Sequence, residues 1–181
     1  MKLPSATSYA FWLSIIRLYA GAFWLMHGIP KFTQSVTFMP PTGMMTTFLN
    51  TAISNTHGPY QAFLTYVVLP NSTIFAEFVR LGEVVAGALL LLGFFSRLGG
   101  VIGVLLAINY LSAHGGLNHL SVWSGIDSTA LVLSAINVVL PTGQMLGVDA
   151  LLSRVKRIAP SAPRAVFVDE PPMTGPTAPT A

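Results

Sequence analysis

The stretch FAEFVRLGEVVAGALLLLGFFSR, residues Phe75–Arg97, decides the fold of this 181-residue chain. From Val84 onward it has the composition of a helix that lies in lipid. Its first third, however, carries three charged residues, Glu77, Arg80 and Glu83. Ionisable side chains are costly inside a membrane and mark functional sites there by default. The segment therefore predicts a membrane protein with a polar interior.

The composition of the whole chain agrees with this interpretation. Hydrophobic residues make up 52% of the sequence and charged residues only 8%, whereas a soluble domain carries about 25% charged residues. So few charges cannot cover a water-facing surface, which indicates a multi-pass protein in contact with the lipid bilayer. The absence of cysteine excludes disulfides and thiol chemistry within the chain. The net charge of +3 is not typical of a nucleic-acid-binding protein, because most basic residues lie near the predicted membrane boundaries.

Four stretches approach the length of about 20 residues that a bilayer core requires. They are residues 8–28, 74–95, 97–114 and 120–140. We therefore predict an all-α fold, an integral membrane four-helix bundle, over residues 1–158. Gly99 and Gly103 form a GxxxG pair that would let the third helix pack closely on a neighbour, and Pro141 would end the fourth helix.

The distribution of Lys and Arg predicts the orientation of these helices. With four spans, Lys2, Arg97 and the basic segment 154–164 all fall on one side, so we expect both termini in the cytoplasm of a cell with an inner or plasma membrane. Residues 33–73 then form a long outward loop, in which Tyr60–Pro70 is too short to cross and would lie in the interface or re-enter the membrane. A fifth span there would place Arg97 and the basic segment on opposite sides.

The C-terminal residues form a region of their own in this prediction. The segment Leu151–Ile158 is short, basic and amphipathic, which suits the inner surface of the membrane. Residues 159–181 are rich in proline, with alanine, threonine and serine, and offer little to pack. We therefore expect a disordered cytoplasmic tail there.

The charges of the opening stretch share one helix face, because they are spaced i, i+3 and i+6. Arg80 can pair with Glu77 or with Glu83, and either choice leaves one carboxylate without a cation. Arg17 lies near the middle of the first span, and Glu83 lies near the middle of the antiparallel second span. An unpaired charge at that depth costs at least about 2.5 kcal/mol. These positions predict an ion pair between Arg17 and Glu83.

Further polar residues are expected nearer the outer surface. They would line a polar channel that opens to the outside and is closed by the Arg17–Glu83 pair, and Asn109 and Tyr110 could face the same channel. The candidate catalytic residues are Glu83, Arg17, Glu77 and Asp127, and the candidate substrate-binding residues are Lys31, His27 and Arg80. A purely architectural role for the buried ion pair also fits the sequence. The four histidines have no spacing typical of a metal site, so neither metal nor haem is predicted.

Three motifs of the chain resemble those of the DoxX/DoxD family. The first motif is RLYAGAFWLMHGIPKF at Arg17–Phe32, the second is GEVVAGALLLLGFFSRLGGVIG at Gly82–Gly103, and the third is SGIDSTALVLSAINVVLPTGQMLGVDALL at Ser124–Leu152. The positions that match are Arg17, His27, Gly28, Lys31, Glu83, Gly87, Arg97, Asp127 and Asp149. The chain departs from the family pattern at Pro141-Thr-Gly, which replaces Gly-Pro-Gly, and at Ile126, which replaces an aromatic residue.

This resemblance implies a four-helix membrane protein and a function. Some members are membrane subunits of thiosulfate:quinone oxidoreductase (TQO), which oxidises thiosulfate to tetrathionate and reduces quinone. It thus implies quinone as electron acceptor and a second redox subunit as partner. The alternative is a non-enzymatic scaffold that recruits or stabilises a soluble redox or detoxification enzyme through the basic segment 154–164 and the tail. The sequence also leaves homo-oligomers open.

The predicted topology can be tested with single cysteines, since the chain contains none. An impermeant maleimide added to intact cells should label Ser54→Cys, in the outward segment, but not Ser161→Cys, in the cytoplasmic tail. Labelling of both after the cells are permeabilised is the control. The reverse pattern in intact cells would overturn the orientation.

Overall fold

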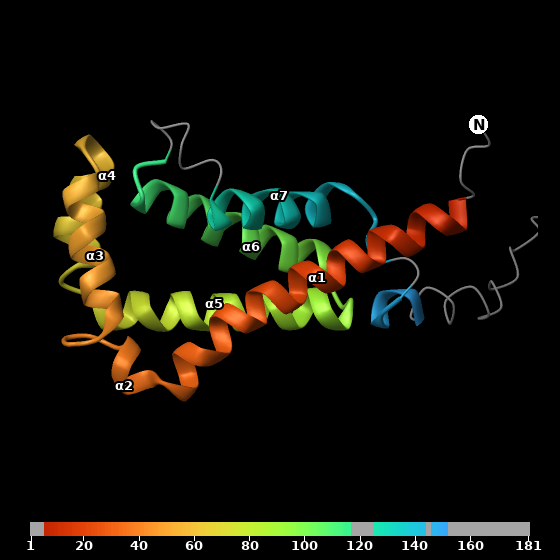
Figure 1. Ribbon diagram of the computed structural model, residues 1–181, viewed down its shortest axis with the longest axis horizontal. Coiled ribbons are helices and arrows are strands. Elements are labelled where there is room, and N and C mark those ends of the chain that lie inside the picture. The colour runs from red at the N-terminus through yellow and green to blue at the C-terminus, as the bar shows by residue number, and fades with distance from the viewer. Residues whose placement is uncertain (1–5, 117–124, 144–145, 152–181) are drawn as a thin grey trace, which may run out of the picture.

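The computed structural model describes residues 6–116, 125–143 and 146–151, and this part of the chain is helical without a β-strand. Figure 1 shows the order of the elements. They are α1 (Ala6–Thr33), α2 (Ser35–Phe38), α3 (Met44–Asn55), α4 (Gly58–Phe63), the π-helical turn η1 (Leu64–Val68), α5 (Ser72–Leu92), α6 (Ser96–Ala113) and α7 (Ile126–Val139). The predicted tail 159–181, and the basic segment Leu151–Ile158 beyond its first residue, lie outside the described residues.

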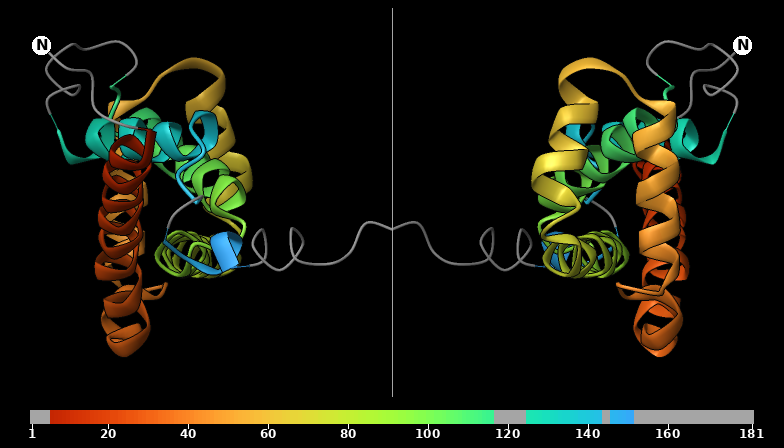
Figure 2. Two further views of the ribbon diagram at one scale, coloured as in Figure 1. Left: turned by 90° about the vertical axis from the view of Figure 1, so that its right-hand side faces the viewer. Right: turned by 90° about the vertical axis from the view of Figure 1, so that its left-hand side faces the viewer.

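The four long helices pack on one another. Helix α1 crosses α5 obliquely and also contacts α7, while α5 packs on α6 and α6 on α7 (Figures 1 and 2). Small residues occupy much of the shared core, in which Ala20, Ala86 and Ala107 are fully buried around Trp24 and Leu90. The predicted all-α fold is thus confirmed, and each of the four predicted spans contains a helix.

Two helices within the described residues are long and apolar enough to cross a membrane, as judged by length and composition. They are Ser8–Thr33 in α1 and Ser96–Ala113 in α6. Helix α5 has 21 residues but carries Glu77, Arg80 and Glu83, and α7 is apolar but has only 14 described residues. Helix α1 ends at Thr33 rather than near residue 28, because Pro30 lies inside its last turn without ending it.

The expectation of a long loop over residues 33–73 is wrong. Most of this segment forms α2, α3, α4 and η1, and we call residues 35–68 the cap. The apolar side chains of α3 recur at helical spacing, so that Met45, Leu49 and Ala52 are buried together. The predicted interfacial segment Tyr60–Pro70 contributes to α4 and η1, and Leu64 of η1 packs in the same cluster as Leu49. The cap stands across one end of α5 and α6 (Figures 1 and 2).

Glycines bring α1 and α5 into close contact. A Cβ atom on Gly87 would lie 2.8 Å from the backbone nitrogen of Leu25 and 2.9 Å from the carbonyl oxygen of Gly21. One on Gly28 would lie 2.9 Å from the Cβ of Glu83. These contacts fix the register of the two antiparallel helices, with Gly28 of α1 opposite Glu83 of α5.

The GxxxG prediction for α6 is confirmed. A Cβ atom on Gly99 would lie 3.2 Å from the carbonyl oxygen of Ala86 on α5, and one on Gly103 would lie 2.5 Å from the Oγ of Ser134 on α7. Helix α6 therefore packs closely on two neighbours through its two glycines.

The α1–α5 contact predicts opposite effects for one substitution at two glycines of α5. Gly87→Ala should lower the melting temperature in detergent, because the new methyl group meets backbone atoms of α1, and overpacking of this kind costs about 1–3 kcal/mol. Gly82→Ala is the matched control, since its Cβ would meet only the side chain of Leu106 at 3.4 Å or more. Gly82→Ala should therefore raise the melting temperature slightly, because alanine favours a helix by up to about 1 kcal/mol over glycine. Equal melting temperatures for the two variants would contradict the close contact.

Candidate functional site

A buried carboxylate joins three helices at the cap end of the molecule. Glu83 of α5 has a side chain that is only 1% exposed, and its Oε1 lies 2.5 Å from the Nζ of Lys31 on α1. The hydroxyl of Tyr110 on α6 donates to the same oxygen at 2.6 Å and accepts a hydrogen bond from Lys31 at 2.9 Å. We call these three residues the Glu83 cluster. The second oxygen, Oε2, is buried and has no hydrogen-bond partner.

The predicted ion pair between Arg17 and Glu83 is wrong, because Lys31 is the cation beside Glu83. The prediction aligned the midpoints of two spans, whereas the glycine contacts place Gly28 opposite Glu83. Arg17 lies about 16 Å further along α1 from Gly28, at about 1.5 Å per residue. It lies there against Gly93 and Gly147 and donates a hydrogen bond to the carbonyl oxygen of Leu146.

The surroundings of Arg17 hold helix ends together. Asp149 accepts hydrogen bonds from the backbone nitrogens of Phe95 at 3.2 Å and Ser96 at 3.3 Å, which begin α6. Gly93, in the turn between α5 and α6, has a φ of 65° and leaves space for the guanidinium group, because a Cβ there would collide with it. Arg17 is fully buried among these groups. Arg17 therefore has a structural role, and it lies remote from the Glu83 cluster.

Glu77 and Arg80 pair with each other rather than with the cluster. The Nε of Arg80 donates to the Oε2 of Glu77 at 2.7 Å, and its Nη2 donates to Oε1. The guanidinium group also lies 4.4 Å from the centre of the Phe32 ring. Arg80 therefore pairs with Glu77 and not with Glu83. Neither Glu77 nor Arg80 lines the two cavities described next.

A cavity of about 270 Å³ lies beside the Glu83 cluster, and we call it the polar cavity because ionisable side chains reach its otherwise apolar wall. Its walls combine aromatic rings with ionisable groups from α1, α3, α5, α6 and α7. The lining residues are Phe23, Trp24, His27, Lys31, Phe48, Glu83, Tyr110, His114, Ile126, Asp127 and Ala130. Of the seven predicted site residues, His27, Lys31, Glu83 and Asp127 are thus brought together, and Arg17, Glu77 and Arg80 are not.

An apolar cavity of about 460 Å³ lies under the cap. Its walls include Phe38, Leu49, Leu64 and Phe75. The polar side chains that also reach it are those of His27, Lys31, Gln34, Thr37, Asn109 and Tyr110. The two cavities share four lining residues, His27, Lys31, Phe48 and Tyr110, and therefore adjoin. At the rim of the apolar cavity, Met26 is 74% exposed and Met44 is 65% exposed.

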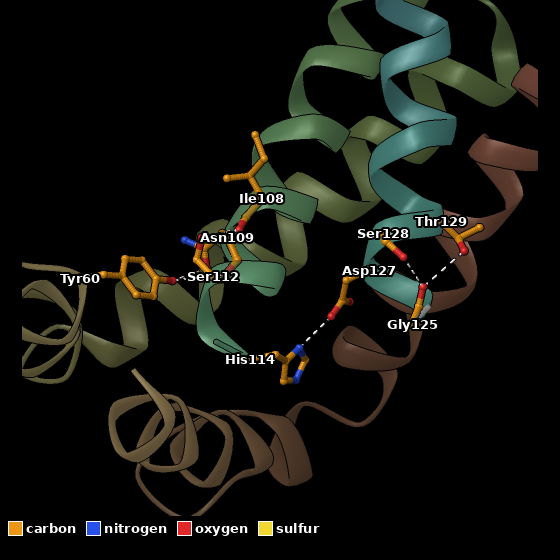
Figure 3. Close-up of polar contacts among 9 residues, drawn as sticks. All are labelled: Tyr60, Ile108, Asn109, Ser112, His114, Gly125, Asp127, Ser128 and Thr129. Atoms are coloured by element: carbon orange, nitrogen blue, oxygen red, sulfur yellow. Dashed lines mark hydrogen bonds and ion pairs between the residues drawn. The ribbon is translucent and has the colours of Figure 1, made fainter. Parts of the chain in front are cut away.

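The sequence analysis missed one ionisable residue of the polar cavity, and it did not identify the aromatic and aliphatic side chains of the wall. His114, which follows α6, lies with its Nδ1 2.7 Å from the Oδ2 of Asp127 in the first turn of α7 (Figure 3). The sequence compared His114 only with His119, which lies outside the described residues. No local spacing indicates a contact across 13 positions. Among the described residues, no three His, Asp or Glu side chains come together as metal ligands would.

These features define an all-helical protein with membrane-type helices and a buried charged cluster between a polar and an apolar cavity. The chain belongs to the DoxD family: the family profile described as "TQO small subunit DoxD" matches residues 12–163. No curated protein and no solved structure matches the chain. The predicted resemblance to the DoxX/DoxD family is confirmed at the level of the family, and with it the membrane association of the protein.

The Glu83 cluster predicts a strong dependence between two substitutions. Lys31→Met should destabilise the protein by about 3 kcal/mol, because it leaves a buried carboxylate without its cation. The double variant Lys31→Met with Glu83→Gln should be more stable than Lys31→Met alone, since it leaves no buried charge. Thermal unfolding in one detergent measures both.

The matched control is the pair of Glu77 and Arg80, in which Glu77 is 38% exposed. Arg80→Met, alone or with Glu77→Gln, should cost less than about 1 kcal/mol through loss of the ion pair. Strictly additive losses for Lys31 and Glu83 would show that their contact does not stabilise the fold.

Proposed function

We propose that the protein is a multi-pass, four-helix membrane subunit of a thiosulfate:quinone oxidoreductase, which passes electrons to quinone in the inner or plasma membrane. Two thiosulfate ions join through a new S–S bond as tetrathionate and release two electrons. Quinone takes up two electrons and two protons and becomes quinol. The observation that carries the proposal is the buried Glu83 carboxylate in a member of the DoxD family. It lines the polar cavity and contacts Lys31 and Tyr110, which line the apolar cavity as well.

The apolar cavity suits the quinone. Its volume of about 460 Å³ falls in the range of small-molecule sites, about 300–1,000 Å³. The aromatic and aliphatic walls match a ring with an apolar tail. At the shared boundary, Lys31 has a third ammonium hydrogen to donate to a quinone carbonyl oxygen, while the hydroxyl hydrogen of Tyr110 is donated to Glu83. Glu83, which contacts both, is placed to provide the protons that the reduced oxygen takes up.

The rim of this cavity indicates how a lipid-soluble quinone reaches it. Met26 and Pro30 of α1 and Met44 of α3 are exposed at the cavity rim. An exposed apolar rim is unfavourable in water but not in the acyl region of a bilayer. We therefore place the opening between α1 and α3 on the lipid side, and the flexible methionine side chains suit an opening that admits a bulky ligand.

We assign thiosulfate to the exposed mouth of the polar cavity, where His27 and His114 lie. Deeper in the cavity, Lys31 is paired with Glu83, and Asp127 adds a second carboxylate. Arg80, expected from the sequence to bind substrate, is instead occupied by Glu77 and lines neither cavity. The family description as a small subunit supports a second subunit as partner, which would contribute to thiosulfate oxidation.

Filling the apolar cavity should weaken quinone binding selectively. Ala52 of α3 is 2% exposed and lines this cavity, so that Ala52→Phe should raise the KM for a short-chain quinone about tenfold without changing the KM for thiosulfate. Steady-state kinetics of the full chain, purified in detergent with any subunit that co-purifies, measures both constants. Ala62→Phe, at an exposed position of α4 outside both cavities, is the control.

The same assay decides between the enzyme and the scaffold. A rise in both KM values, or in neither, would contradict the assignment of quinone to the apolar cavity. If the wild type transfers no electrons from thiosulfate to quinone but retains a soluble redox enzyme on purification, the non-enzymatic scaffold replaces the proposed function.

A further inference from the structure

His114 and Asp127 form a polar pair at the edge of the polar cavity. Figure 3 shows the two side chains directed toward each other from the end of α6 and the beginning of α7. Their Nδ1 and Oδ2 atoms lie 2.7 Å apart. The side chain of His114 is 45% exposed and that of Asp127 is 16% exposed. The pair therefore has one member in contact with solvent and one facing inward, and both line the same cavity as Glu83.

Glu83 needs a connection to water if it provides protons. Its side chain is 1% exposed, and its Oε1 is already occupied by Lys31 and Tyr110. Its Oε2 is buried without a hydrogen-bond partner, and Glu83 lines the polar cavity. The cavity volume of about 270 Å³ is sufficient for several water molecules, each of which occupies about 30 Å³ in the liquid. Water in this cavity would connect the His114–Asp127 pair to the Glu83 cluster, whose three members all line it.

We propose that His114 and Asp127 form the proton-uptake path that supplies Glu83 during quinone reduction, an inference that rests on the proposed function. Thiosulfate oxidation releases two electrons and no proton, whereas quinone takes up two electrons and two protons. Each proton is taken from water by the exposed imidazole of His114 and passes through Asp127 and cavity water to the Glu83 cluster. From there Lys31 or Tyr110, both of which contact Glu83 and line the apolar cavity, passes it to a quinone oxygen. The path is used twice for each quinol formed.

The neighbours of the pair favour this path. Phe48 of α3 packs edge-on against the imidazole of His114, with ring centres 5.5 Å apart, and against Tyr110 at 5.9 Å. This contact holds the imidazole at the cavity wall. The other ionisable groups on the cavity are His27 and Lys31 from α1, Glu83 from α5 and Tyr110 from α6. His27 is also exposed, but its Nδ1 is bonded to the carbonyl oxygen of Phe23 at 2.8 Å, so His114 has the carboxylate partner that His27 lacks.

The proton path can be separated from electron transfer by a change of acceptor. Ferricyanide takes up one electron and no proton, so its reduction by thiosulfate needs no proton path. His114→Ala should lower the rate with a short-chain quinone about tenfold or more and the rate with ferricyanide less than twofold. Added imidazole should restore much of the quinone rate, because it can carry protons at the exposed site of the missing side chain. Asp127→Asn should show the same preference for ferricyanide.

The matched control is His57→Ala, at an exposed histidine that precedes α4 and lines neither cavity, which should leave both rates unchanged. Equal losses with both acceptors, or no loss with either, would overturn the proton path and leave the proposed function intact. An acceptor-selective loss in His27→Ala but not in His114→Ala would also overturn it, in favour of α1. A wild-type protein that reduces neither acceptor would overturn the proposed function and the path together.

Discussion

The contact of the Glu83 carboxylate with Lys31 and Tyr110 is the interaction on which the interior of this protein depends. A carboxylate that is 1% exposed is stable as a charged group only with a cation and hydrogen-bond donors beside it. Here the cation comes from α1 and the hydroxyl from α6, so that one buried group joins three helices. The contact requires α1 and α5 to approach closely, and Gly28 allows this because any side chain there would collide with Glu83.

The buried charges of Arg17 and Glu83 have different roles at the two ends of the glycine-lined contact between α1 and α5. At one end, Arg17 and Asp149 connect the α5–α6 turn with the segment that follows α7, through the carbonyl oxygen of Leu146 and the backbone nitrogens of Phe95 and Ser96. These contacts satisfy helix ends and buried backbone groups. At the other end, Lys31 and Glu83 lie on the wall of a cavity, and Glu83 retains a carboxylate oxygen without a partner. The second arrangement adds a histidine–carboxylate pair, His114 and Asp127, on the same cavity.

The cap gives this site its second property, an apolar cavity next to the charged cluster. Without α3 and η1, the ends of α5 and α6 would leave Phe75 and Ala113 without the side chains that now cover them. The cap encloses an apolar volume and leaves exposed methionines at its rim. In the proposed function, the two cavities that share Lys31 and Tyr110 would take the electron donor and the lipid-soluble acceptor separately.

The sequence by itself determined the all-α class, the approximate positions of the long helices, the close packing at Gly99 and Gly103, and four residues of the polar cavity, because composition and helical periodicity are local properties. It did not determine which cation pairs with Glu83, since the midpoint of a span says nothing about the register between two helices, and that register follows from backbone contacts at Gly28 and Gly87. The helices of the cap were not predicted from the sequence, because the apolar positions of α3 lie within a proline- and threonine-rich stretch. The His114–Asp127 pair was not predicted either, because residues 13 positions apart meet only when the end of α6 packs beside the beginning of α7.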